Sequence, residues 1–132
     1  MRINVVTIYV TDQEKAKSFY TDKLGFKIKD DAAFGPNPLD RWLTVVSPED
    51  EITELYLAHE EIYPGAKAYR EAMYAAKKPP VGLTVKDIQA TYKALVEKGV
   101  EFTREPIQES WGWDAGIDDG CGNIINLHQE NR

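Results

Sequence analysis

The sequence has almost no cysteine and no long apolar run, and each shortage excludes a class of protein. A single cysteine, Cys121, rules out an internal disulfide and cannot form a zinc knuckle by itself. We expect it to be a turn residue between two glycines rather than a reactive thiol. No apolar stretch reaches the length of a membrane span, and residues 1–10 lack the cleavage site of a signal peptide. We therefore expect a cytoplasmic protein with no membrane partner.

Basic residues are also too few to favour nucleic acid as a partner. Lys and Arg number 16 against 22 Asp and Glu, which gives a formal net charge of -6. No basic stripe is available to replace the counterions along a phosphate backbone. Hydrophobic residues make up 42% of the chain and charged residues 29%, as in ordinary globular proteins. The 132 residues fit one domain, or two small fused modules, with a real core.

What the chain does contain is an internal repeat. Residues 6–26 read as a strand, a helix that begins at a capping box from Thr11 to Glu14, and a left-handed glycine stop at Gly25. Residues 81–102 repeat this pattern, with Asp87 as the cap. Strand-like runs follow each helix, at 27–29, 42–46 and 52–57 in the first half and at 101–103, 113–117 and 123–128 in the second.

This repeat predicts an α+β fold built from tandem βαβββ modules. We place the modules at residues 1–60 and 80–132 and the connector at residues 61–79. The connector has an alanine-rich middle that could form a short helix, and two prolines make residues 35–40 a loop. We expect a cupped, mostly antiparallel mixed sheet, in a twisted eight-stranded arrangement of two similar halves, with the helices on its outer face.

Alternation along the strands predicts which side chains face away from the helices, on what we call the second face of the sheet. Val6, Ile8 and Val10 should lie under the first helix, which turns their neighbours to the other side. The residues expected on the second face are Val5, Thr7, Tyr9, Glu54, Tyr56, Pro80, Gly82, Thr84, Asn126 and His128. Because this face is polar and partly aromatic, we expect it to line a concave cleft between the two halves.

Three stretches of the chain carry a resemblance to a known family. They are "IYVTDQEKAKSFYTDKLGF", "VKDIQATYKALVEKGVEF" and "GCGNIINLH". They resemble the vicinal oxygen chelate superfamily, which holds glyoxalases, bleomycin resistance proteins and extradiol dioxygenases. The resemblance covers nearly the whole chain and implies two βαβββ modules forming a cupped sheet, commonly within a homodimer. It also implies a divalent metal in the catalytic members.

The family's metal positions, carried over residue by residue, fall on Val5, Glu54, Pro80 and Asn126. Two of these side chains have no donor atom, and Asn126 offers a neutral amide where the family has a carboxylate. A catalytic metal site normally keeps about three protein ligands. The resemblance therefore implies a member without a metal cofactor, although a weak divalent site at Glu54, Asn126 and His128 stays open as an alternative.

The first functional hypothesis is a metal-free protein of the bleomycin-resistance type that binds a small amphipathic or aromatic molecule. Glu54 would offer a negative charge to a cationic ligand, and flat aromatic rings of the protein would stack on the apolar body of that ligand. The candidate ligand-binding residues are Thr7, Tyr9, Trp42, Tyr56, Trp111, Trp113, Asn126 and His128. The pair Trp111 and Trp113, separated by a glycine, is the best candidate for a stacking platform.

Two other hypotheses remain open at this point. The chain could be an enzyme, either a metal-dependent isomerase, lyase or dioxygenase, or a metal-free catalyst in which Glu54 is the general base. In that second version Asn126 or His128 would hydrogen-bond a developing oxyanion. The cup could instead be filled by another chain and serve only for assembly. Under all three hypotheses we expect a homodimer.

Overall fold

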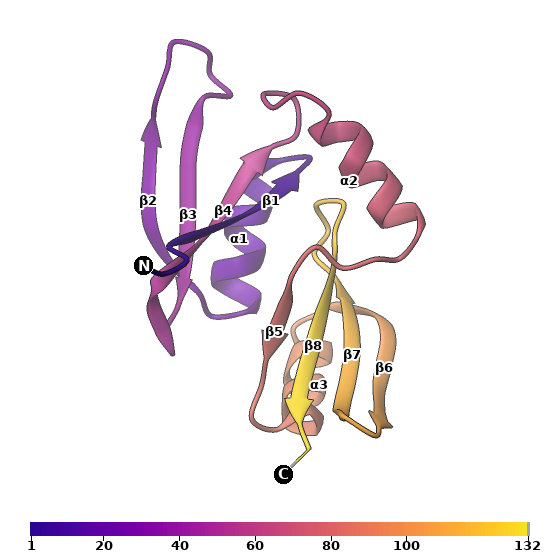
Figure 1. Cartoon of the computed structure of the whole chain (residues 1–132). Coiled ribbons are helices and arrows are strands. Elements are labelled where there is room, and N and C mark those ends of the chain that lie inside the picture. Colours follow the sequence, from indigo (N-terminus) through magenta and orange to yellow (C-terminus); the bar gives the residue numbers. More distant parts are fainter. Residues whose placement is uncertain (132) are drawn as a thin grey trace.

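The structure is a computed structural model that describes residues 1–131, and its strands form two four-stranded mixed sheets (Figure 1). The order in sheet A is β1 (Val5–Val10), β4 (Asp50–His59), β3 (Arg41–Ser47) and β2 (Lys27–Ala33). The order in sheet B is β5 (Gly82–Thr84), β8 (Ile124–Glu130), β7 (Gly112–Asp118) and β6 (Glu101–Glu109). β1 pairs in parallel with β4, and β5 pairs in parallel with β8. The other strand pairs are antiparallel.

This architecture confirms the α+β fold with its repeated βαβββ order. Within the described chain, the eight strands form two hydrogen-bonded sheets of four, one from each βαβββ module. Figure 1 shows sheet A and sheet B in different parts of the molecule, with the connector passing between them. Each sheet therefore has its own second face.

The helices begin and end where local chemistry dictates. Helix α1 (Gln13–Ser18) runs into a π-helical turn, η1 (Phe19–Lys23), and α3 (Ile88–Glu97) is its counterpart in the second module. Asp12 caps α1 by accepting the N–H of Lys15 at 3.1 Å, so the cap is one residue later than Thr11. Asp87 caps α3 as expected, accepting the N–H of Ala90 at 3.0 Å. Gly25 and Gly99 hold the left-handed φ values of 77° and 82° that end the two helical segments.

Strand alternation places the two cores as expected. Ile8, Val10, Leu55 and Leu57 are buried in the core of sheet A, beneath α1. The core of sheet B lies beneath α3 and contains Ile88, Leu95, Ile117, Ile125 and Leu127. Phe19 and Leu24, from the end of the first helical segment, pack against both cores. The two modules therefore share an apolar boundary.

A buried polar junction also joins the modules. The hydroxyl of Tyr20 donates to Oδ2 of Asp119 at 2.8 Å, and both side chains are almost fully buried. Asp119 also accepts the backbone N–H groups of Cys121 and Asn123. Asn123 Nδ2 donates to the carbonyl of Tyr9 at 2.8 Å, so the loop after β7 is bonded to the first module. Burial is the main cause that raises the pKa of Asp119 above its ordinary value.

Cys121 lies within this junction, in the bend expected for it. Its side chain is 1% exposed and packs in the core of sheet A. Burial, together with the nearby Asp119 carboxylate, raises the pKa of the thiol to about 12. A thiol with that pKa stays protonated at neutral pH, so Cys121 is a packing residue and not a nucleophile.

The connector contains α2 (Ala66–Ala75), which contacts β1 (Figure 1). Ala76 is the C-cap of this helix, and Lys77 then takes a left-handed φ of 56°, a conformation that residues other than glycine rarely adopt. Among residues 1–131, no helix combines the length and the apolarity needed to cross a bilayer.

Candidate functional site

The second face of sheet A carries a group of stacked aromatic side chains, which we call the aromatic cluster. The rings of Trp42 and Tyr56 lie 4.2 Å apart, centroid to centroid, at an interplanar angle of 34°. Tyr9 lies 6.0 Å from Tyr63 and 6.3 Å from Tyr69, with the second pair edge to face. The cluster therefore combines Tyr9 and Tyr56, which were expected on this face, with the candidate Trp42 and two tyrosines of the connector.

Tyr63 and Tyr69 of the connector pack against the other rings of the cluster. The hydroxyls of Tyr56 and Tyr63 lie 3.0 Å apart and share a hydrogen bond. Tyr56 is 2% exposed, and burial is the main cause that raises its pKa, with the bond to Tyr63 adding to it. Thr7, also expected here, pairs with Tyr56 in the β1–β4 ladder but is solvent-exposed. Tyr63 and Tyr69 could not be assigned from the sequence, since no strand alternation orients a connector helix.

Glu54 lies on the same sheet, at the start of the ladder between β4 and β1. It pairs with Val5, and its Oε1 accepts a hydrogen bond from the hydroxyl of Thr44 at 2.8 Å. The carboxylate is half-buried. Its charge is thus partly offset by a hydroxyl and not by a cation.

The second face of sheet B carries a polar network centred on Asp114, which we call the Asp114 network. Oδ1 of Asp114 lies 2.9 Å from Nδ1 of His128 and accepts a bond from Asn126 Nδ2 at 3.2 Å. Oδ2 accepts the indole N–H of Trp111 at 2.6 Å. Arg104 Nη2 in turn donates to Oδ1 of Asn126 at 3.4 Å. Asn126, His128 and Trp111 are therefore brought together by one carboxylate.

Asp114 is the functional candidate that sequence reasoning missed. The side chain is buried, which alone would raise the pKa of its carboxyl, but the hydrogen bonds from Trp111, His128 and Asn126 outweigh burial and lower the pKa. Asp114 is therefore ionised at neutral pH. The signal was present in the sequence, because alternation puts Asp114 on the face opposite its neighbour Trp113.

Trp113 is a correction to the expected site. Its side chain packs against the core of sheet B, with Ile88, Leu95 and their neighbours, and so lies on the helix side. Trp111 is 61% exposed and lies in the turn between β6 and β7. The expected Trp111–Trp113 platform does not form, because Trp111 lies in the turn before β7 and is not oriented by strand alternation. Gly112, between the two tryptophans, has a positive φ of 138°.

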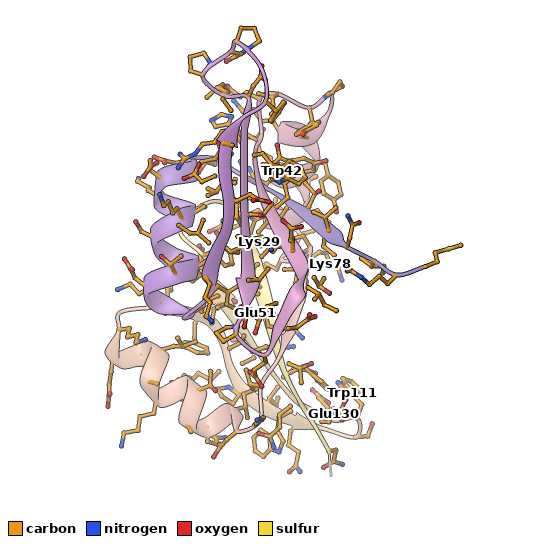
Figure 2. All side chains as sticks on the ribbon, turned by 90° about the vertical axis from the view of Figure 1, so that its left-hand side faces the viewer. Lys29, Trp42, Glu51, Lys78, Trp111 and Glu130 are labelled. Carbon is orange, nitrogen blue, oxygen red and sulfur yellow. The ribbon has the colours of Figure 1, made fainter. Side chains whose placement is uncertain are left out.

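The aromatic cluster and the Asp114 network lie apart within one chain. Figure 2 shows Trp42 near one end of the molecule and Trp111 near the other. Trp42 belongs to β3 of sheet A, while Trp111 adjoins β7 of sheet B. One chain therefore presents two separate faces, one aromatic and one polar.

The donors at the family's metal positions do not fit a divalent cation. Val5 and Pro80 have no donor atom, Glu54 is bonded to Thr44, and the amide of Asn126 is bonded through both its oxygen and its nitrogen. Glu54 and His128, the pair considered for a weak metal site, lie on different sheets. Within residues 1–131, no group of three or more His, Cys, Asp or Glu side chains gathers closely enough to hold a metal ion.

Comparison with known proteins identifies the family. Residues 2–127 match the Glyoxalase/Bleomycin resistance protein/Dioxygenase superfamily. The chain belongs to this superfamily. Within it, the uncharacterized protein YurT of Bacillus subtilis (strain 168) is 44% identical over 98% of this chain and 100% of its own length.

Solved structures of the superfamily share the fold. A member from Sphaerobacter thermophilus DSM 20745 is 32% identical, with a TM-score of 0.80 over 98% of each chain. TnmS3, an antibiotic binding protein from Streptomyces sp. CB03234, is 29% identical, with a TM-score of 0.75 over 99% of this chain and 97% of that one. The family resemblance drawn from the sequence motifs is thereby confirmed.

Proposed function

We propose that this glyoxalase-superfamily protein is a metal-free binding protein that holds a small aromatic or amphipathic molecule. The observation that carries the proposal is the aromatic cluster, where Trp42 and Tyr56 stack 4.2 Å apart on a sheet face that has no helix layer of its own module. Trp42 is half-buried and supplies the accessible ring of this stack, because Tyr56 is 2% exposed and holds Trp42 in place. The likeness to the antibiotic binding protein TnmS3 supports the same class of ligand.

The ligand site of the proposal uses both the aromatic and the polar face. A planar apolar body would lie against the aromatic cluster, and the Asp114 network would hydrogen-bond its polar edge through His128 and Trp111. Because Trp42 and Trp111 lie far apart in one chain, we propose that two copies combine to bring an aromatic face opposite a polar face. We propose this two-copy site as the reason for the expected homodimer. We also propose the cytoplasm as the location of the protein.

Ligand binding is tested by tryptophan fluorescence against a panel of planar aromatic antibiotics. We expect saturable quenching with micromolar affinity, weakened at least tenfold by Trp42→Ala and about threefold by Trp111→Phe. Trp113→Phe is the matched control, since Trp113 lies on the helix side and should leave affinity unchanged. A panel without any saturable response would refute the binding function.

The assembly and the metal-free state need separate measurements. Analytical ultracentrifugation should give twice the 15.0 kDa mass of the chain. A monomer that still binds the ligand fully would contradict the two-copy site. Elemental analysis and calorimetric titration with nickel, zinc, manganese and iron(II) should show no stoichiometric site. Binding of one of these metal ions at micromolar concentration would contradict the proposal that the protein is metal-free. It would favour isomerase, lyase or dioxygenase chemistry.

A second candidate function is metal-free acid–base catalysis, and one observation favours it. His128 and Asp114 form an oriented imidazole–carboxylate pair at 2.9 Å, which leaves Nε2 of His128 for a substrate proton. This pair is better arranged for proton transfer than Glu54, whose Oε1 is bonded to Thr44. If a bound compound is turned over, His128→Gln should abolish turnover and Glu54→Gln should not.

A further inference from the structure

A cavity of about 410 Å³ lies where the connector meets the second face of sheet B. Its walls come from the end of the connector and from β6, β7 and β8. The lining residues are Lys77, Lys78, Pro79, Thr103, Arg104, Gly116, Ile124 and Asn126. Three of these residues are cationic and none is acidic, although the whole chain carries a formal charge of -6.

These three cations are not neutralised by the protein. Within the described chain, Lys77, Lys78 and Arg104 take part in none of the ion pairs, while eight such pairs form elsewhere. Arg104 makes only the 3.4 Å bond to the neutral amide of Asn126. Like charges gathered at one cavity repel each other, and a bound anion would relieve that repulsion.

Asp114 is bonded to a residue of the cavity wall, since its Oδ1 accepts from Asn126 Nδ2 at 3.2 Å. Its two oxygens are already used by Asn126, His128 and Trp111. Asp118 and Glu101 face each other across β7 and β6, separated from the pair of Gly116 and Arg104 by the pair of Phe102 and Ile117. The two oxygens of Asp118 are used as well, one by the hydroxyl of Tyr74 and the other by the N–H of Gly120. None of these three carboxylates lines the cavity.

The backbone keeps the cavity open at its floor. A Cβ added to Gly116 would lie 2.6 Å from Oγ1 of Thr103 and 3.7 Å from both Arg104 Cβ and Ile124 Cγ2, all in lining residues. A side chain at this position would therefore force Thr103, a lining residue, to shift. On the connector side, Lys77 holds its position with a left-handed backbone, a conformation that costs free energy in any residue but glycine.

From these observations we propose that the cavity is an anion subsite, which binds a carboxylate, sulfonate or phosphate group. Arg104 supplies paired N–H donors, Lys77 and Lys78 supply point charges, and the Asn126 amide orients the guanidinium. Asn126 lines the cavity and is bonded to Asp114, so an anion here would adjoin the Asp114 network. The inference rests on the proposed binding function and narrows it to ligands that carry an oxyanion, in place of the cationic ligand expected from Glu54.

The test uses inorganic phosphate, sulfate and acetate as probes, with ionic strength held constant by sodium chloride. Two-dimensional ¹H–¹⁵N spectra of the full chain should show saturable shifts at the amides of Lys77, Gly116 and Asn126. We expect Arg104→Gln to weaken binding at least fivefold and Lys78→Gln about threefold. Gly116→Ala should also weaken binding without any change of charge. Lys93→Gln, on α3 and away from the cavity, is the matched control.

Each outcome decides the proposal. Equal affinities in Arg104→Gln, Lys78→Gln and Lys93→Gln, or shifts that do not saturate, would overturn it. Binding of phosphate and sulfate without acetate would assign a tetrahedral oxyanion, while binding of all three would extend the site to carboxylates. Because these probes have no ring, they bind independently of the aromatic cluster. Failure of the aromatic panel alone would end the proposed function and leave the anion subsite intact.

Discussion

The indole N–H of Trp111 donates to the carboxylate of Asp114 at 2.6 Å, so a buried charge fixes the orientation of an exposed ring. Trp111 is 61% exposed, and a ring so exposed would normally sample several rotamers. The hydrogen bond to Asp114 holds the Trp111 ring in one orientation on the second face of sheet B, where Asp114 also bonds His128. Preorganisation of this kind reduces the entropy lost when a ligand binds.

Replacing Asp114 should therefore loosen the whole network. We expect Asp114→Ala to lower the free energy of unfolding by about 2 kcal/mol at pH 7, because Trp111, His128 and Asn126 lose their acceptor. The folded-state pKa of Asp114 is lowered, so its contribution is present above the ordinary carboxyl pKa and is lost as pH falls through the lowered value. Denaturant unfolding at pH 7 and pH 2 measures both effects. Asp30→Ala, at an exposed position of β2, is the control and should change little.

The ion pair of Asp31 and Arg41 gives a second pH prediction. Arg41 bonds Asp31 through Nε at 2.8 Å and Nη2 at 2.9 Å, and it is the largest cause that lowers the pKa of Asp31 to about 2. We expect Asp31→Asn to cost about 1 kcal/mol at neutral pH, after allowance for the 28% exposure of its side chain.

That cost should disappear as pH falls from about 4 to about 2, because the lowered pKa stabilises the folded state only while the carboxyl is ionised. Parallel unfolding curves of both proteins across this range provide the measurement. Glu51→Gln serves as the control, since its pair with Lys27 is 3.5 Å long and over half exposed (Figure 2). A pH-independent difference would show that Asp31 acts through packing and not through charge.

The buried bond between Tyr20 and Asp119 predicts how the modules unfold. Tyr20→Phe removes one of the donors to a carboxylate that is 1% exposed, and we expect a loss of about 2 kcal/mol. Unfolding should remain a single transition, because Phe19 and Leu24 still pack against both cores. Calorimetry measures the transition, and Tyr92→Phe, whose hydroxyl bonds exposed Glu105, is the control. Two resolved transitions would contradict the shared boundary.

Lys77 links stability to the proposed anion subsite. Lys77→Gly should relieve the left-handed backbone at φ 56° and raise the free energy of unfolding by up to about 1 kcal/mol. The same change removes a charge from the cavity and should weaken phosphate binding about threefold. Lys78→Gly, one residue later, should destabilise slightly while weakening phosphate binding to a similar degree. Equal stability changes at the two positions would show that Lys77 is not strained.

Most of the fold follows from local patterns in the sequence. Ile8 and Val10, and Ile125 and Leu127, alternate with polar or aromatic neighbours, and each lies in the core that this alternation predicts. Asp87 and Gly99 mark the ends of α3 because capping chemistry acts over a few residues. Thr11 and Asp12 are both residue types that cap helices. The sequence predicted the cap of α1 at Thr11, one residue before the cap at Asp12.

The site was less predictable, because it depends on contacts between distant residues. Strand alternation predicted Asn126 and His128. Asp114, which is hydrogen-bonded to both, was not predicted as a site residue. The path of the connector depends on contacts with distant residues, so no local pattern predicts that Tyr63 and Tyr69 reach the aromatic cluster.

The shared packing of Phe19 and Leu24 has a consequence for how the repeat can change over evolutionary time. A duplicated half that keeps its own sealed core can be lost, exchanged or copied again. Here each half would expose apolar surface if the other were removed, since Phe19, Leu24 and Val81 pack against both cores. The two halves are therefore inherited together, and their second faces can diverge in chemistry only while this common seam is kept.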